Sequence, residues 1–146
     1  MVILDSNLLL YATMPIFSQH KPVKGWLDFA LSSGNDIIGI TWQVAASFIR
    51  VATNRRIFDQ PLGITDVQNV LNDLFDHQMV SKVGPTEDHW AIYSNLLTEL
   101  NLSGDIVMDA RIAAIAIEHK ASVASCDKDF RRFSDHVKII DPMKKK

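Results

Sequence analysis

The sequence has little of several features that mark specialised classes of protein. It holds one cysteine, Cys126, so no internal disulfide can form and the fold does not depend on oxidation. The longest apolar runs, Ile37–Ile40 and Ile112–Ile117, fall far short of the roughly 20 apolar residues that a membrane span needs. The Met1–Leu4 start carries no positively charged leader, so we expect no secretory signal. These absences predict a cytoplasmic protein with no membrane segment.

An excess of positive charge is also missing. The formal net charge of the 146 residues is −2, which argues against bulk, non-specific binding to nucleic acid, because such domains are strongly basic. A local basic patch is compatible with this balance, and so is a cluster of carboxylates that a metal ion neutralises. With 47% hydrophobic and 22% charged residues, the chain is expected to build a core as a single domain.

Short apolar runs alternate with longer stretches of helical periodicity along the chain. The expected strands are Val2–Leu4, Ile37–Ile40, Met79–Val83, Ser122–Ser125 and Val137–Ile140. Strands that alternate with helices in this way predict an α/β fold with a parallel sheet covered on both faces. In such sheets, sites form where strands end and helices begin.

Local signals predict where several helices begin or break. Pro15 and Pro22 predict breaks in the first helical stretch. The Thr65–Gln68 run is typical of a capping box that opens a helix. In the helix expected after Thr86, Trp90 is predicted to lie on the apolar, inward face.

Aspartates stand at the predicted edge of the sheet. Asp5 directly follows the first strand, and Asp127 follows the strand Ser122–Ser125. Asp109 lies in the first turns of an apolar helix, with Asp105 four residues earlier on the same face. Converging carboxylates repel one another and persist only if they share a cation. A hard divalent ion such as Mg²⁺ suits oxygen ligands, which indicates phosphodiester hydrolysis by a metal-bound water.

Each acid also has a purely structural explanation. Asp5 could cap the first helix, and Asp127 could be a turn residue. Asp105 could be a helix-start residue that the helix dipole stabilises. Asp109 is harder to explain in this way, because the apolar run that follows it disfavours a carboxylate without a partner. Spacing alone therefore favours a metal site without deciding the matter.

At these residues the sequence resembles the PIN-domain family and, within it, the VapC toxins of prokaryotic toxin–antitoxin pairs. The matching stretches are Ile3–Asn7, Gly104–Ala110 with Ala113 and Ala114 after it, Cys126–Phe130 followed by Phe133, and Thr53–Phe58. The resemblance implies that residues 1–141 form one PIN-like nuclease domain, a roughly five-stranded parallel sheet flanked by helices on both faces. Residues 142–146 would then form a basic C-terminal tail.

The same resemblance implies an endoribonuclease toxin that needs Mg²⁺ or Mn²⁺, forms a homodimer and is neutralised by a small antitoxin protein. The implied catalytic and metal-binding acids are Asp5, Asp109 and Asp127, with Asp105 as an additional candidate ligand of the metal. Ser6 and Asn7 would belong to the hydrogen-bonding shell that orients these acids.

One residue departs from the family pattern. The family usually has a glutamate in a run resembling Val-x-x-Glu-Phe, and here Val44–Phe48 puts Ser47 at that place. The departure leaves two functions open. The first is an active ribonuclease toxin. The second is a catalytically weakened PIN-fold module that only pairs with an antitoxin, and the test between them is whether expression alone stops growth and degrades RNA.

Basic and bulky apolar side chains suggest contacts with other molecules. Arg111, Arg55 and Arg56 are candidates for contacting RNA, although a single surface cation is more often merely solvated. Several bulky apolar residues exceed what the core of a small domain can bury, which favours self-association. They are Ile16, Phe17, Trp26, Phe29, Trp42, Ile57 and Phe58.

Other α/β enzymes fit the sequence poorly. A dinucleotide-binding protein needs a Gly-x-Gly-x-x-Gly turn after its first strand, and neither that turn nor a P-loop follows Asp5. An aspartyl-phosphate phosphatase requires a second aspartate two residues later, where Asn7 stands.

Overall fold

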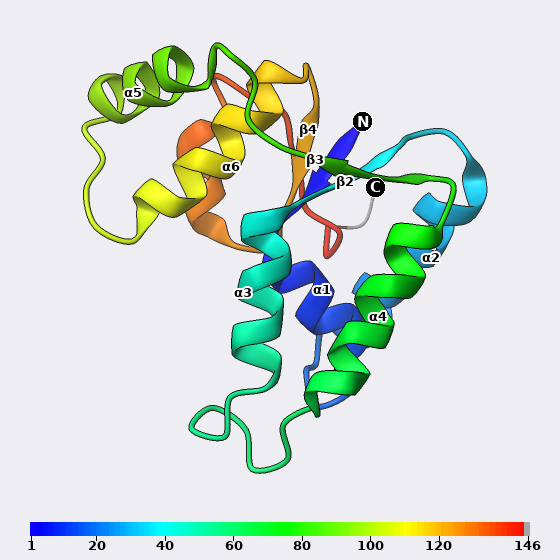
Figure 1. Ribbon diagram of the computed structural model, residues 1–146. Coiled ribbons are helices and arrows are strands. Elements are labelled where there is room, and N and C mark those ends of the chain that lie inside the picture. The colour runs from blue at the N-terminus through cyan, green and yellow to red at the C-terminus, as the bar shows by residue number, and fades with distance from the viewer. Residues whose placement is uncertain (145–146) are drawn as a thin grey trace.

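A five-stranded parallel sheet forms the centre of the computed structural model (Figure 1). Its strands are β1 (Val2–Leu4), β2 (Ile38–Thr41), β3 (Val80–Val83), β4 (Ser122–Ala124) and β5 (Ile139–Ile140). They lie in the order β3-β2-β1-β4-β5, and every neighbouring pair is parallel. The structure describes residues 1–144, so Lys145 and Lys146 of the predicted basic tail lie outside the described residues.

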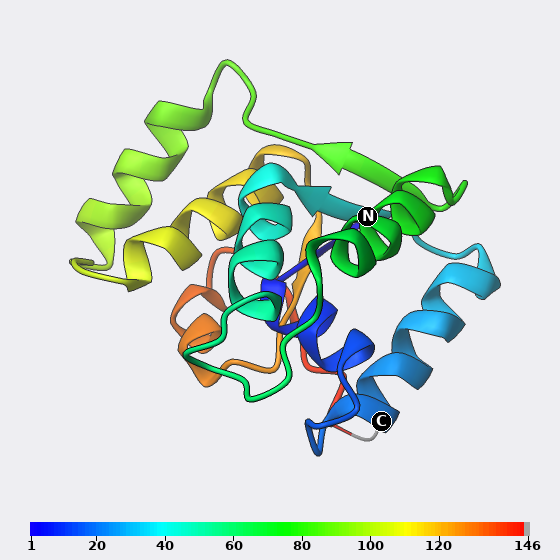
Figure 2. The same cartoon turned by 60° about the horizontal axis from the view of Figure 1, so that its bottom comes forward.

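Helices cover the sheet on both sides, as predicted. They are α1 (Ser6–Thr13), α2 (His20–Ser33), α3 (Trp42–Ala52), α4 (Ile64–Asp76), α5 (His89–Glu99), α6 (Ile106–Glu118) and the 3₁₀ helix η1 (Lys128–Phe133). Helices α5, α6 and η1 gather on one side, whereas α2 and α4 lie on the other (Figures 1 and 2). Within residues 1–144, none of the helices combines the length and hydrophobicity that a membrane span requires.

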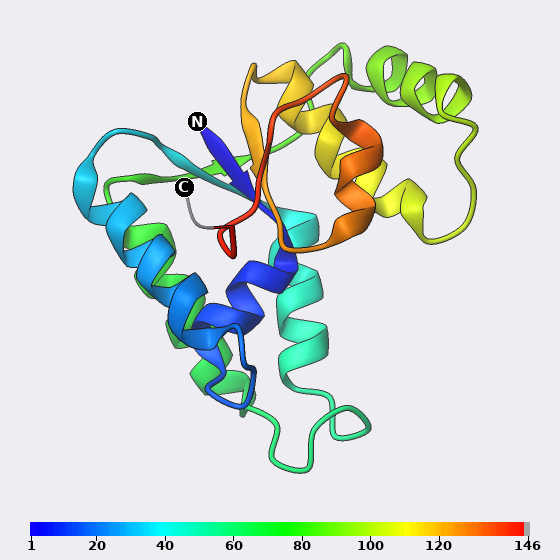
Figure 3. The same cartoon turned by 180° about the vertical axis from the view of Figure 1, so that it is seen from behind.

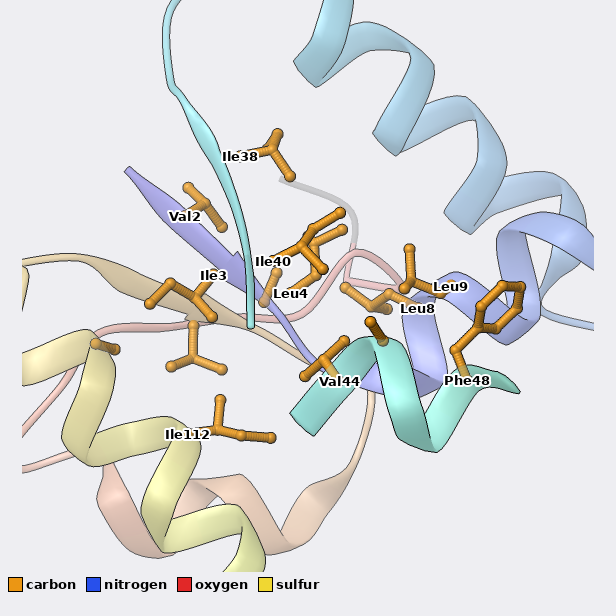
Figure 4. Close-up of a cluster of buried hydrophobic side chains, with 14 of the residues drawn as sticks. Val2, Ile3, Leu4, Leu8, Leu9, Ile38, Ile40, Val44, Phe48 and Ile112 are labelled. Carbon is orange, nitrogen blue, oxygen red and sulfur yellow. The ribbon is translucent and has the colours of Figure 1, made fainter. Parts of the chain in front are cut away.

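The core is centred on β1, the middle strand of the sheet. All of its side chains are buried, and Figure 4 shows them packed with residues of α1, α3 and α6. Ile3 of β1 pairs with Gly39 of β2. A Cβ at Gly39 would lie only 3.0 Å from Cγ1 of Ile3 and 3.2 Å from Cγ2 of Val83. The strands can therefore pack this closely only because position 39 has no side chain.

Helices begin directly at the carboxyl ends of β1 and β2. Thr41 ends β2 and caps α3, because its hydroxyl accepts a hydrogen bond from the amide of Val44 at 3.1 Å. Asp5 plays the same part between β1 and α1. These two short junctions place the first turns of α1 and α3 side by side at one edge of the sheet.

Three of the local predictions are wrong. Pro22 does not break a helix: it lies in the first turn of α2, where its missing N–H leaves no intrahelical bond unmade. The capping box at Thr65 does not form, because α4 begins at Ile64 with Gly63 at its N-cap and no side-chain cap. Trp90 of α5 points outward and is 71% exposed, so the inward face of that helix is narrower than its apolar residues indicated.

Candidate metal and catalytic site

Asp5 lies buried at the carboxyl end of the central strand, with only 4% of its surface exposed. Its backbone amide continues the pairing with β4 by donating to the carbonyl of Ala124 at 2.9 Å. The carboxylate caps α1, since Oδ1 accepts the amide of Ser6 at 2.7 Å. Burial, more than any other cause, raises the pKa of Asp5 above its ordinary value. Asp5 therefore does cap α1, as its purely structural explanation predicted, and this cap holds the carboxylate in place.

Ser125 connects this carboxylate to Asp127. Its hydroxyl donates to Oδ2 of Asp5 at 2.8 Å and accepts the amide of Asp127 at 3.0 Å. Asp127 in turn caps η1, because its Oδ1 accepts the amide of Asp129 at 2.9 Å. One buried serine thus fixes the relative positions of two acids that are 122 residues apart in the chain, the difference between 127 and 5.

Asp109 approaches the same place from the first turn of α6. Its pKa is raised to about 7, first by burial and then by the negative charges of Asp5 and Asp127. Asp129 and Asp105, both exposed, add smaller contributions of the same sign. The structure therefore brings Asp5, Asp109 and Asp127 together at the carboxyl edge of the sheet, with Asp105 on the rim.

The first turn of α6 is held by side chains of two other helices. Gln43 of α3 donates from Nε2 to the carbonyl of Met108 at 2.9 Å and accepts from Arg111 at 3.2 Å. The hydroxyl of Tyr93 in α5 donates to the carbonyl of Val107 at 2.6 Å. The segment that carries Asp109 is thereby anchored on both sides.

The other residues expected at the site vary in their distance from the acids. Ser6 contributes mainly its backbone amide, and within the described residues the side chain of Asn7 makes no hydrogen bond. Ser47 is half-buried on α3, one turn after Gln43. Arg55 and Arg56 are exposed and follow the carboxyl end of α3. This helix has 11 residues and is about 16 Å long, so the two arginines lie far from Gln43 in its first turn.

Sequence reasoning missed three residues near the acids. Ser125 and Gln43 belong to residue types that are common in any soluble protein, so nothing in the sequence set them apart. Burial and the neighbouring Cys126 are the largest causes of the raised pKa of Tyr11 in α1, and Asp5 and Asp127 lie near enough to contribute as well. For Ser125, the available signal was its place at a strand end two residues before Asp127.

The candidate ligands of the site are all of one chemical type. In the part of the chain described, no group of three or more His, Cys, Asp or Glu side chains is arranged so that it could by itself hold a metal ion. No ion pair among residues 1–144 neutralises Asp5, Asp109 or Asp127. All of the candidate ligands are carboxylate oxygens, and Mg²⁺ commonly takes one or two carboxylates while keeping several waters. The residues therefore fit a hydrated, hard divalent ion.

Comparison with known proteins gives consistent matches over the chain. The PIN domain family model matches residues 2–135. Ribonuclease VapC37 of Mycobacterium tuberculosis is 39% identical over 133 residues, which is 91% of this chain and 92% of that protein. Ribonuclease VapC31 of the same species is 35% identical over 145 residues, 98% of this chain and 100% of that one. Among solved structures, VapBC2 from Rickettsia felis, bound to a promoter DNA fragment, has a TM-score of 0.70 at 20% identity, covering 97% of this chain and 98% of its own.

Proposed function

The chain belongs to the PIN-domain family, and we propose that it is a divalent-metal-dependent endoribonuclease that hydrolyses RNA phosphodiester bonds. The observation that carries the proposal is that Ser125 links Asp5 to Asp127 through hydrogen bonds, while the charges of both acids raise the pKa of Asp109. No ion pair among the described residues neutralises these acids. Such a concentration of negative charge is stable when a cation is shared. Further support comes from relatives that match nearly the whole chain and are named ribonucleases.

The roles of the side chains follow from their contacts. Asp5, Asp109 and Asp127 would hold a Mg²⁺ or Mn²⁺ ion, with Asp105 available from the rim. When bound, the ion would activate a water as nucleophile and offset charge on the phosphate. Ser125 keeps two of the carboxylates in fixed orientation, as partners of metal ligands commonly do. Gln43 holds both the first turn of α6 and the guanidinium of Arg111, and that guanidinium would contact a phosphate at the rim.

A small antitoxin is the second part of the proposal. The sequence resembles the VapC toxins of toxin–antitoxin pairs, and solved structures of this fold include assemblies named VapBC2 and VapBC-1. A protein that degrades cellular RNA would otherwise stop the growth of the cell that makes it. We therefore expect the chain to be tolerated only when its antitoxin is made at the same time.

Expression in a bacterial host tests the activity and the partner together. Production of the chain alone should arrest growth and degrade RNA, whereas Asp109→Asn produced at the same level should do neither. Co-expression with the antitoxin should restore growth. Normal growth and intact RNA with the unaltered chain, combined with stable antitoxin binding, would instead support the weakened binding module that Ser47 suggests.

A further inference from the structure

A groove of about 1050 Å³ runs between α2 and the β4–β5 side of the sheet. Ser125 and Asp127 line it, so it adjoins the acidic site at Asp127, whereas Asp5 and Asp109 are not among its lining residues. Figure 3 shows α2 on one side of this region, β4 on the other, and the C-terminal segment between them. Pockets that hold drug-sized ligands measure roughly 300–1,000 Å³, so this groove lies at the upper end of that range.

Aromatic side chains form the wall that α2 contributes. Trp26 and Phe29 lie three residues apart on one face of that helix, and both line the groove. Phe29 is 67% exposed, although a large aromatic side chain is normally buried. Flat apolar rings on an accessible wall are surfaces on which nucleobases stack, whatever the base.

Cations line the opposite wall and the C-terminal end. They are Lys128, Arg131, Lys138 and Lys144. Within the described part of the chain, none of these side chains takes part in an ion pair or a side-chain hydrogen bond. The lining also holds three acids. Asp36 is 3.5 Å from the N-terminal ammonium, Asp127 belongs to the proposed metal site, and the carboxylate of Asp141 accepts the amide of Met143 at 3.0 Å. The four cations therefore outnumber the acids by one, in a chain whose net charge is −2.

We propose that this groove binds the single-stranded RNA substrate on one side of the scissile bond. Bases would stack on Trp26 and Phe29, and phosphates would lie near Lys128, Arg131 and Lys138. This inference rests on the proposed ribonuclease function, because an RNA whose reactive phosphate lies at Asp127 must continue into a neighbouring space. Asp127 is one of the residues that line the groove, and the lining carries more cations than acids, which favours a polyanion.

Binding of a fluorescein-labelled oligouridylate, measured by fluorescence anisotropy in EDTA to prevent metal-dependent cleavage, tests the proposal. Lys138→Glu and Arg131→Glu should each weaken binding by roughly tenfold at low salt, and each should lower the salt dependence by about one counterion. Phe29→Ala should weaken binding roughly fivefold, since it removes a stacking surface. With Mg²⁺, the same variants should raise KM for RNA and leave kcat unchanged.

Matched controls separate the groove from general surface effects. Lys82 lies in β3, at the opposite edge of the sheet from Lys138, so Lys82→Glu makes the same charge change away from the groove. Trp90 is 71% exposed on α5, so Trp90→Ala removes an exposed ring elsewhere. Both controls should bind the oligouridylate as the wild type does.

The outcomes distinguish this inference from the function on which it rests. If the wild type cleaves RNA but all three groove variants bind RNA as the controls do, the groove is not the RNA-binding site. The proposed ribonuclease function would be unaffected by that result. Wild type that neither binds nor cleaves RNA overturns both. Groove variants that bind RNA normally but escape neutralisation by the antitoxin would assign the groove to a protein partner and also overturn the proposal.

Discussion

The hydroxyl of Ser125 lies 2.8 Å from Oδ2 of Asp5 and joins the ends of β4 and β1. Because the same oxygen accepts the amide of Asp127, both of its hydrogen-bonding capacities are used. The bond matters for stability as well as for geometry, since Asp5 is almost fully buried. A buried carboxylate that loses a donor keeps the whole cost of its desolvation.

Ser125→Ala is therefore expected to destabilise the protein by about 1–3 kcal/mol near neutral pH. The loss should shrink in acid, where protonation of Asp5 removes the charge that the hydroxyl solvates. Urea unfolding at both pH values measures the effect. Ser81→Ala, a similar change in β3 where no side-chain hydrogen bond is lost, should leave the free energy of unfolding nearly unchanged. Equal stability of the two variants would contradict this role for Ser125.

The raised pKa of Asp109 predicts how stability without metal depends on pH. Its pKa is about 7 in the folded protein, against an ordinary value of 3.8 in the unfolded chain, so the folded state binds more protons between these values. Stability in EDTA should consequently fall as the pH rises from about 4 to about 7. Asp109→Asn lacks this penalty.

The asparagine variant should accordingly be more stable than the wild type above pH 7, by about 1–2 kcal/mol once solvent screening of this partly exposed group is allowed for. The two proteins should converge near pH 4. Thermal unfolding in EDTA across this range provides the comparison. A wild type that remains the more stable protein above pH 7 would show that the acids do not repel one another as described.

Ser47 and Asp105 together test how the site manages without the usual glutamate. A site poorer by one charge should bind its first ion weakly and prefer Mn²⁺, which stands higher than Mg²⁺ in the affinity order. Gln43, one turn before Ser47, contacts the first turn of α6. Ser47→Glu should tighten metal binding, provided that the new carboxylate reaches the acids from this side of α3. Asp105→Asn should weaken binding by more than a helix-dipole role of about 0.3–1 kcal/mol explains.

Calorimetric titration of Mn²⁺ into wild type, Ser47→Glu and Asp105→Asn measures these differences directly. If all three proteins show the same affinity, the idea that Asp105 compensates for the missing glutamate is wrong. Asp105 would then be only a residue at the start of α6.

Exposed apolar side chains predict that the protein self-associates. Ile16, Trp42 and Ile57 are all more than half exposed, and they belong to the bulky apolar residues that exceed what the core can bury. Phe29 is exposed too, but it lines the groove that we propose for RNA. Phe17 and Trp26 are half-buried, whereas Phe58 is buried. Light scattering at high micromolar concentration should give the mass of a dimer, and a strict monomer would count against the prediction.

The parallel sheet and the place of the acids could be predicted because both follow from local patterns. Apolar runs fix the strands, and parallel strands necessarily bring their carboxyl ends to one edge. These features depend on a few neighbouring residues, which the sequence displays directly.

Features that depend on distant contacts could not be predicted in this way. Gln43 contacts Met108 across 65 residues, and only the folded chain shows that they meet. Gly63 takes the N-cap of α4, although Thr65 has the better capping side chain, and the preceding residue, Leu62, is bonded through its amide to the carbonyl of Ala52 in α3. Trp90 is exposed because α5 packs on α6 through other residues of its sequence, with the hydroxyl of Tyr93 bonded to Val107.

The most direct test of the central claim is cleavage of single-stranded RNA by the purified protein with and without divalent metal. We predict cleavage with Mn²⁺ or Mg²⁺, none in EDTA, and none at any metal concentration with Asp109→Asn. Asp135→Asn, the same substitution at an exposed acid after η1, should cleave at the wild-type rate. Wild-type cleavage in EDTA, or undiminished cleavage by Asp109→Asn with Mn²⁺, would contradict the assignment of these aspartates to a metal-dependent ribonuclease site.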